Sequence, residues 1–165
     1  MTYVEEKEVE AGLSLCTLRT GEDLFGIETS AVREALYQCE LRQVPLAPQF
    51  VAGVLAYRGE VLLAVSFRAL LGLPANTDTC CAIVLEDKES GEPFALLIDE
   101  LLDVVQVAAS AWEPNPATLD ERRSGLFSGV YRSAGAPLVR LQPERLQPSW
   151  LTRNGVAAMA LGGTR

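Results

Sequence analysis

Short apolar runs separated by turn residues dominate this chain, and they predict a protein built mainly of β-strands. The runs are rich in aliphatic residues and are bounded by glycine, proline or polar residues, as is typical of strands; they are residues 13–19, 24–27, 61–67, 93–98 and 99–107. Residues 79–85 are apolar on both faces, which indicates a fully buried strand. Long helices and β-α-β crossovers are missing from the pattern, which disfavours a doubly wound fold. We therefore expect two linked, closed β-barrels.

A few segments depart from the strand pattern. Ser30 is predicted to cap a short helix, because Val32, Ala35 and Leu36 follow at the spacing of one helical face. Residues 48–54 predict a further helical turn, and residues 112–124, with two prolines and no clear period, predict a surface loop.

A hairpin tip is predicted at residues 58–60, where Gly59 is free to adopt a positive φ. Residues 68–71 then fit a single helical turn that Gly72 stops. The hairpin tip and the helical turn lie at the two ends of the predicted strand at residues 61–67, so the ends of this strand are well defined.

The chain also repeats itself. Gly53 and Gly59 recur as Gly129 and Gly135 at one constant offset, and the aliphatic positions around them recur with them. Upstream, Phe25-Gly26-Ile27 is echoed by Phe94-Ala95-Leu96. Two copies of one unit predict paired subdomains with a groove between them, and such a groove suits partner binding.

Composition narrows the class of protein. The 165 residues are a single-domain length, and 48% of them are apolar, as in an ordinary globular protein. The apolar runs are too short to span a bilayer, and the acidic N-terminus carries no secretory signal, so a cytoplasmic location is expected. The net charge of −8 argues against nucleic-acid binding, because phosphate backbones require clustered positive charge.

Candidate chemistry is sparse. The chain has no histidine and no C-x-x-C spacing, so we expect no metal and no cofactor. Free thiols in a reducing compartment are expected instead at Cys16, Cys39, Cys80 and Cys81.

Three acids cluster at Asp99, Glu100 and Asp103. In a strand, Asp99 and Glu100 point to opposite faces, while Asp99 and Asp103 share a face about 13 Å apart. Paired catalytic carboxylates in glycosidases lie roughly 5–9.5 Å apart. We therefore expect solvated or partner-facing acids and no enzyme.

The order of several motifs resembles the CheW-like family of chemotaxis coupling proteins. An aliphatic strand is followed by V-x-E, a proline segment, F-x-x-G-V, an R-G hairpin and R-x-L-L-G; these are residues 25–27, 32–34, 44–45, 50–54, 58–60 and 67–72. The resemblance covers approximately residues 13–146.

That resemblance implies two five-stranded SH3-like barrels, one from each half of the sequence, in a single domain over residues 13–148. An acidic segment, residues 1–12, would precede it, and a tail, residues 151–165, would follow. It also implies a non-catalytic adaptor that links the cytoplasmic hairpin tips of chemoreceptors to the regulatory domain of a CheA-type histidine kinase. Such a protein is recruited to membrane receptor arrays without membrane insertion.

The resemblance assigns two residues to partner-binding surfaces, namely the glutamate of V-x-E (Glu34) and the arginine of the R-G hairpin (Arg58). The residues support this independently, because Arg58 adjoins a turn glycine, where a core role is unfavourable. A Glu34–Arg58 contact would orient the guanidinium at the surface. The alternative is an ordinary exposed ion pair that adds little to folding.

Three apolar residues, Val32, Val54 and Leu102, either line the partner-binding groove or fill a barrel. A receptor tip is a helical hairpin, so it would present apolar anchors to such a groove. The chain departs from the family pattern at Ala56, where asparagine is usual, and at Tyr57, where an aliphatic residue is usual. A flagellar pathway and a twitching or other motility pathway both remain open.

Two other classes of function remain beside the adaptor. A small-ligand-binding double barrel would require an apolar pocket with a few convergent polar groups. A carboxylate-dependent hydrolase would require two acids close together in a cleft.

Overall fold

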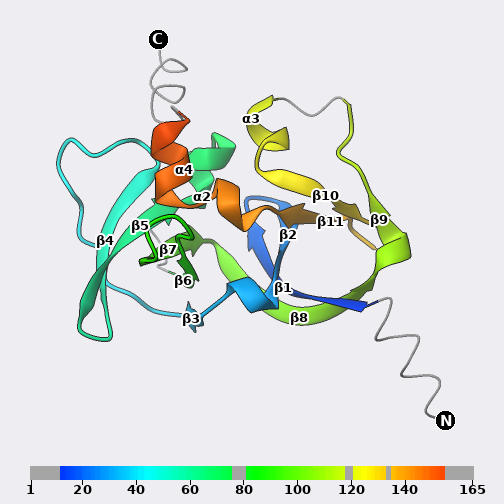
Figure 1. Ribbon diagram of the computed structural model, residues 1–165, viewed down its shortest axis with the longest axis horizontal. Helices are drawn as coiled ribbons and strands as arrows, with labels where there is room; N and C mark the ends of the chain where they lie inside the picture. Colours follow the sequence, from blue (N-terminus) through cyan, green and yellow to red (C-terminus); the bar gives the residue numbers. More distant parts are fainter. Residues whose placement is uncertain (1–11, 76–80, 118–120, 133–134, 155–165) are drawn as a thin grey trace.

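The computed structural model describes residues 12–75, 81–117, 121–132 and 135–154, which form two curved β-sheets lying side by side (Figure 1). The first sheet has the order β8-β1-β2-β11-β10-β9. Its strands are β1 (Gly12–Thr20), β2 (Asp23–Glu28), β8 (Glu100–Ala108), β9 (Trp112–Glu113), β10 (Phe127–Tyr131) and β11 (Leu138–Leu141). The second sheet has the order β3-β6-β7-β5-β4. Its strands are β3 (Glu34–Leu36), β4 (Val51–Tyr57), β5 (Glu60–Ser66), β6 (Cys81–Glu86) and β7 (Pro93–Ile98).

Helical segments are short. Three are 3-10 turns, namely η1 (Thr29–Ala31), η2 (Ala109–Ala111) and η3 (Pro143–Arg145). The α-helices are α2 (Phe67–Leu71), α3 (Glu121–Ser124) and α4 (Pro148–Arg153). Within the described ranges, no helix has the length and apolarity to cross a membrane.

Each sheet curls into a barrel because its two edge strands follow one another in the chain. In the first sheet the edges are β8 and β9, which only the three residues of η2 separate. In the second sheet the edges are β3 and β4. Between them Arg42 exchanges two 2.8 Å backbone hydrogen bonds with Val54 of β4. The predicted architecture of two linked barrels is confirmed, although the two-residue β9 raises the first barrel to six strands.

The two barrels exchange strands between the sequence halves. The hairpin β1–β2 joins β8 to β11 from the second half, and β6–β7 joins β3 to β5 from the first half. Each exchange includes one parallel strand pair: β2 pairs with β11, and β7 pairs with β5. The expectation that each half of the sequence forms its own barrel is therefore wrong. With or without the exchange, each strand would lie beside strands of the same kind. The local sequence pattern therefore does not distinguish exchanged barrels from barrels made of one half each.

A large apolar cluster lies between the sheets and joins them. We call it the central cluster, and it includes Phe25 of β2, Phe67 of α2 and Phe127 of β10. The ring centroid of Phe25 lies 4.9 Å from that of Phe67, edge-to-face, and 5.7 Å from that of Phe127. The interior of the second barrel is a separate cluster around Leu55 and Leu62. The shared core makes the two barrels one packing unit.

The repeated glycines mark places where two chain segments cross closely. Gly53 and Gly129 both have φ of 154° and both lie where a strand pairing shifts register. A Cβ on Gly53 would lie 2.3 Å from the carbonyl oxygen of Arg42, and one on Gly129 would lie 2.2 Å from Nε1 of Trp112. The close approach explains why both repeats require glycine there.

Several local predictions are corrected by tertiary pairing. Residues 29–36 form η1 and then strand β3 rather than a helix, because the Arg33 N–H donates to the Val84 carbonyl at 2.8 Å and β3 pairs with β6. Residues 51–57 continue as β4 rather than as a helical turn. The predicted surface loop at residues 112–124 contains β9 and α3.

The cysteine prediction is confirmed in part. Cys16 and Cys81 are buried free thiols. Burial raises the pKa of both thiols. Cys39 is disulfide-bonded, so the expectation of a free thiol is wrong for that residue. Cys80 lies outside the described residues, as do residues 1–11 of the predicted N-terminal segment and 155–165 of the predicted tail.

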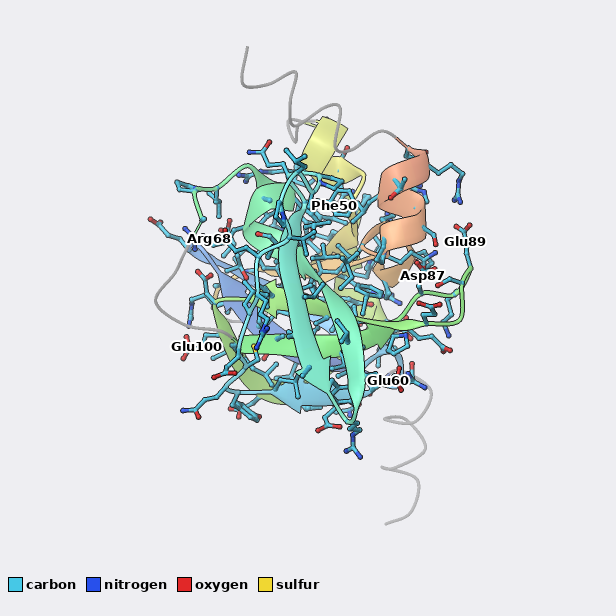
Figure 2. The ribbon with its side chains drawn as sticks, turned by 90° about the vertical axis from the view of Figure 1, so that its left-hand side faces the viewer. Phe50, Glu60, Arg68, Asp87, Glu89 and Glu100 are labelled. Carbon is cyan, nitrogen blue, oxygen red and sulfur yellow. The ribbon has the colours of Figure 1, made fainter. Side chains whose placement is uncertain are left out.

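The C-terminal helix α4 is tied to the loop that joins β6 and β7. Asp87, which is buried, accepts hydrogen bonds from the backbone N–H groups of Ser149 at 2.9 Å, Glu89 at 2.9 Å and Ser90 at 3.2 Å. Figure 2 shows Asp87 and Glu89 beside this helix. Leu151 of α4 is fully buried in the central cluster, although the sequence placed it in the tail.

Asp87 makes stability depend on pH. Its burial raises the pKa of the carboxyl, but the hydrogen bonds from Ser149, Glu89 and Ser90 outweigh burial and lower the pKa below its ordinary value. A lowered pKa stabilises the fold fully above the ordinary value of about 3.9, and this stabilisation is lost as the pH falls through the folded-state pKa.

We expect Asp87→Asn to reduce the free energy of unfolding at pH 7 by about 1.5–3 kcal/mol, the range for hydrogen bonds to a charged group. Urea unfolding of both proteins between pH 7 and pH 2 checks this. The difference between parent and variant should shrink as the pH falls below about 4. A difference that stays constant over that range would contradict the assignment.

Leu46 has an unfavourable backbone conformation. Its φ is 62° and its side chain is fully exposed, in a turn where the Ala47 N–H donates to the Val44 carbonyl at 3.4 Å. Asparagine tolerates this left-handed region far better than leucine. We expect Leu46→Asn to raise the free energy of unfolding by about 0.5–1 kcal/mol, measured by urea denaturation. Leu46→Ala keeps the strain and should leave stability nearly unchanged, so an equal effect of both variants would contradict the explanation.

Candidate functional site

The β4–β5 hairpin brings Arg58 to the edge strand β3. Arg58 and Gly59 occupy the two-residue turn with φ of 50° and 80°, the positive values of a tight hairpin turn, so the prediction for Gly59 is confirmed. Glu34 is the first residue of β3 and pairs with Val84 of β6. Figure 2 shows Glu60 at the tip of this hairpin. Closure of the second barrel, which brings its edge strands β3 and β4 together, thus places side chains 24 positions apart in the sequence next to each other.

Three hydrogen bonds converge on one oxygen of Glu34. Its Oε1 accepts from Arg58 Nη2 at 2.7 Å, from Arg58 Nε at 3.0 Å and from the Tyr57 hydroxyl at 2.8 Å. The Arg58 guanidinium carbon also lies 5.4 Å from the centroid of the Tyr57 ring, within cation–π distance. We call this arrangement the Glu34–Tyr57–Arg58 cluster. The predicted Glu34–Arg58 contact is confirmed.

The cluster remains ionised and partly exposed. The hydrogen bond from Tyr57, followed by that from Arg58, lowers the pKa of Glu34, and donating to the Glu34 carboxylate raises the pKa of Arg58. The exposed fraction is 69% for the Arg58 side chain and 34% for that of Glu34. An oriented, solvent-accessible guanidinium of this kind suits the recognition of an anionic group on another molecule.

The three predicted apolar residues do not form one patch with this cluster. Val32, two residues before Glu34, packs against the central cluster. Val54 lies on β4, partly exposed, with Leu63 as its cross-strand partner. Leu102 is half-buried on β8 of the other sheet, where a register shift sets residues 102 and 103 opposite Thr17. Their role in binding stays a prediction.

Two exposed apolar features contain residues that, apart from Val54, were not predicted from the sequence. On the hairpin, the cross-strand pair Ala56–Val61 continues the pair Val54–Leu63 on one face, and Val61 is 72% exposed. We call these four residues the hairpin strip. On β8, Val104 pairs with Cys16 of the central cluster and is nevertheless 57% exposed. In both places an apolar strand face continues beyond the part that other residues bury. The alternation of apolar and polar residues in the sequence does not show where burial ends.

Two of the three clustered acids are held by arginines in structural pairs. Asp99 Oδ2 lies 2.5 Å from Arg68 Nη1 and accepts the Gly21 N–H at 2.9 Å, which links the two sheets. Glu100 pairs with Arg19 at 3.0 Å. In the described part of the chain, no group of three or more histidines, cysteines or acids is placed to hold a metal ion.

A pocket of about 250 Å³ lies near η1 and η3. Seven of its ten lining residues are charged or polar; the ten are Glu28, Ser30, Ala31, Arg33, Leu85, Glu86, Lys88, Pro143, Glu144 and Gln147. Pockets that bind small molecules are usually larger and mostly apolar. This pocket therefore does not favour the small-ligand-binding alternative.

Comparison with known proteins places these features in a family context. Residues 14–149 match the family described as the CheW-like domain. The chemotaxis protein CheW of Rhizobium meliloti (strain 1021) is 27% identical over 149 residues, which covers 90% of this chain and 96% of that protein. The chemotaxis protein CheW of Treponema pallidum (strain Nichols) is 23% identical over 137 residues, with 80% of each chain covered.

Among solved structures, the chain is similar to the crystal structure of the scaffolding protein TtCheW from Thermoanaerobacter tengcongensis. The TM-score is 0.71 at 18% sequence identity, and the match covers 81% of this chain and 91% of that one. At this identity the likeness concerns the fold, and it agrees with the pair of barrels described above.

Proposed function

Because the chain belongs to the family of CheW-like domains, we propose that it is a non-catalytic adaptor that couples the cytoplasmic tips of chemoreceptors to a CheA-type histidine kinase. The observation that carries the proposal is the Glu34–Tyr57–Arg58 cluster. It joins the glutamate of V-x-E to the arginine of the R-G hairpin, which the family resemblance assigns to partner-binding surfaces, and leaves that arginine 69% exposed.

The kinase side of the proposal uses the β4–β5 hairpin. The hairpin strip supplies exposed apolar surface on the same hairpin as the oriented Arg58. Interfaces with apolar centres and arginine anchors bind protein partners well. We propose that the regulatory domain of the kinase docks here.

The receptor side uses apolar residues at the margin of the central cluster. Val32, just before β3 of the second sheet, packs against this cluster. Val104, on β8 of the first sheet, pairs with Cys16 of the same cluster. The tip of a receptor is a helical hairpin, and an amphipathic helix binds through apolar anchors on one face. We propose that Val32, Val104 and the neighbouring Leu102 receive these anchors. The adaptor would then act in the cytoplasm at receptor arrays, without inserting into the membrane.

Coupling is tested by co-sedimentation. Vesicles that carry a receptor from the same genome are mixed with the kinase, with and without this protein, and the sedimented kinase is measured. Kinase should sediment with the vesicles only when the adaptor is present. Val104→Asp should abolish this recruitment and leave binding to the isolated kinase domain intact, because the two surfaces differ. Equal recruitment without the adaptor would refute the proposal.

A further inference from the structure

The Arg58 guanidinium has two hydrogen-bonding edges, and the chain engages one of them. Nε and Nη2 both donate to Oε1 of Glu34, at 3.0 and 2.7 Å. Over the described ranges, Nη1 has no acceptor, and the side chain is 69% exposed. The outer edge, formed by Nη1 and the second N–H of Nη2, is therefore available to another molecule. A guanidinium edge of this geometry matches a carboxylate, which can accept two parallel hydrogen bonds.

Tyr57 anchors this arrangement in the fold. Its ring packs partly buried against the interior cluster of the second barrel, and its hydroxyl donates to the Glu34 oxygen that also binds Arg58. An exposed ion pair between long side chains ordinarily samples many conformations. The third hydrogen bond and the 5.4 Å contact between the guanidinium and the ring restrict both members of the pair. Such preorganisation lowers the entropic cost of binding.

We propose that Tyr57 is a positioning residue, which holds Glu34 and Arg58 so that the outer edge of the guanidinium receives a carboxylate from the protein partner. The proposal rests on the proposed function, because the partner is the kinase regulatory domain. Val61 of the hairpin strip is 72% exposed on the same hairpin, so a partner that docks on this hairpin would also bury apolar surface. An apolar surround excludes water and strengthens such a contact.

Three variants distinguish the planar geometry of the Arg58 guanidinium, its positioning by Tyr57 and the effect of positive charge alone. Arg58→Lys keeps the charge and loses the planar edge, so affinity for the regulatory domain should fall about tenfold. Tyr57→Phe keeps the ring and loses the hydroxyl, so affinity should fall roughly threefold or more. Arg132→Lys is the matched control, because Arg132 forms another exposed ion pair, at 2.9 Å with Glu113. It should leave affinity unchanged.

Two further readouts distinguish positioning from a merely structural role. The pKa of Glu34, followed by NMR, should rise toward its ordinary value in Tyr57→Phe. Exposed acids of the regulatory domain are also changed to amides one at a time. One change should weaken binding about as much as Arg58→Lys and add little when combined with it.

The outcomes separate the two proposals. If the parent binds the regulatory domain and Arg58→Lys binds equally well, or no acid of the partner couples to Arg58, the inference is overturned and the adaptor function stands. If Tyr57→Phe shifts the pKa of Glu34 and leaves affinity unchanged, the positioning role of Tyr57 is overturned. If the parent does not bind the regulatory domain, the kinase part of the proposed function fails and this inference fails with it.

Discussion

Replacing Gly53 by alanine is expected to lower the free energy of unfolding by about 3 kcal/mol, since overpacking and backbone strain each cost roughly 1–3 kcal/mol. The new Cβ would lie 2.3 Å from the carbonyl oxygen of Arg42, and the φ of 154° is unfavourable for alanine. Arg42 is held there by two backbone hydrogen bonds to Val54, so it cannot move without opening the barrel. Urea denaturation followed by circular dichroism measures the loss.

Gly59→Ala is the matched control for this prediction. Gly59 also has a positive φ, 80°, but a Cβ there would meet nothing within 4 Å. The control should lose only the cost of backbone strain, about 1 kcal/mol. If Gly53→Ala costs no more than Gly59→Ala, the close crossing is not what requires glycine at this position.

Leu151→Ala is expected to lower the free energy of unfolding by about 2–5 kcal/mol, the range for truncating a leucine in a packed core. Leu151 is fully buried in the central cluster, and the hydrogen bond from the Ser149 N–H to Asp87 holds α4 against the β6–β7 loop. Chemical denaturation of the full-length chain measures the effect.

The neighbouring Thr152 is exposed and serves as the control, so Thr152→Ala should change stability by less than about 0.5 kcal/mol. Similar small effects of both substitutions would mean that α4 is a dispensable tail. The predicted difference would instead make this helix part of the folded domain.

The sequence predicted the elements better than it predicted their partners. Strands β1, β2, β5 and β7 were predicted at nearly their observed bounds, because hydrophobic runs and turn residues are local signals. The hairpin at Gly59 was predicted for the same reason. The exchange of β1–β2 and β6–β7 between the repeats depends on long-range packing, which a pattern along the chain does not contain.

The candidate site shows the same division. Contact between Glu34 and Arg58 was predicted, and in the structure Arg58 Nη2 lies 2.7 Å from Glu34 Oε1. Glu34, however, lies on a strand rather than on the predicted helix. Three apolar positions favoured a helix there, whereas the pairing of β3 with β6 decides the outcome. In the sequence, Tyr57 is a departure from the family pattern, in which an aliphatic residue is usual. Its hydrogen bond to Glu34 emerges only when β3 and the hairpin meet.

The strand exchange also bears on how an adaptor of this kind would work. Both barrels bury one face in the central cluster, so neither can turn against the other without exposing that cluster. The hairpin strip and Val104 lie on different sheets and extend beyond the covered faces. A rigid body with two separate exposed surfaces is suited to holding two partners at a fixed distance.

The central claim is that this protein binds a histidine kinase through the β4–β5 hairpin, and calorimetric titration tests it most directly. The purified chain is titrated with the regulatory domain of a CheA-type kinase from the same genome, in parallel with Arg58→Ala. We predict micromolar binding by the parent, about −8 kcal/mol, and at least a tenfold loss for Arg58→Ala with an unchanged unfolding midpoint. No binding by the parent at high protein concentration, or equal affinity of the two proteins, would contradict the account.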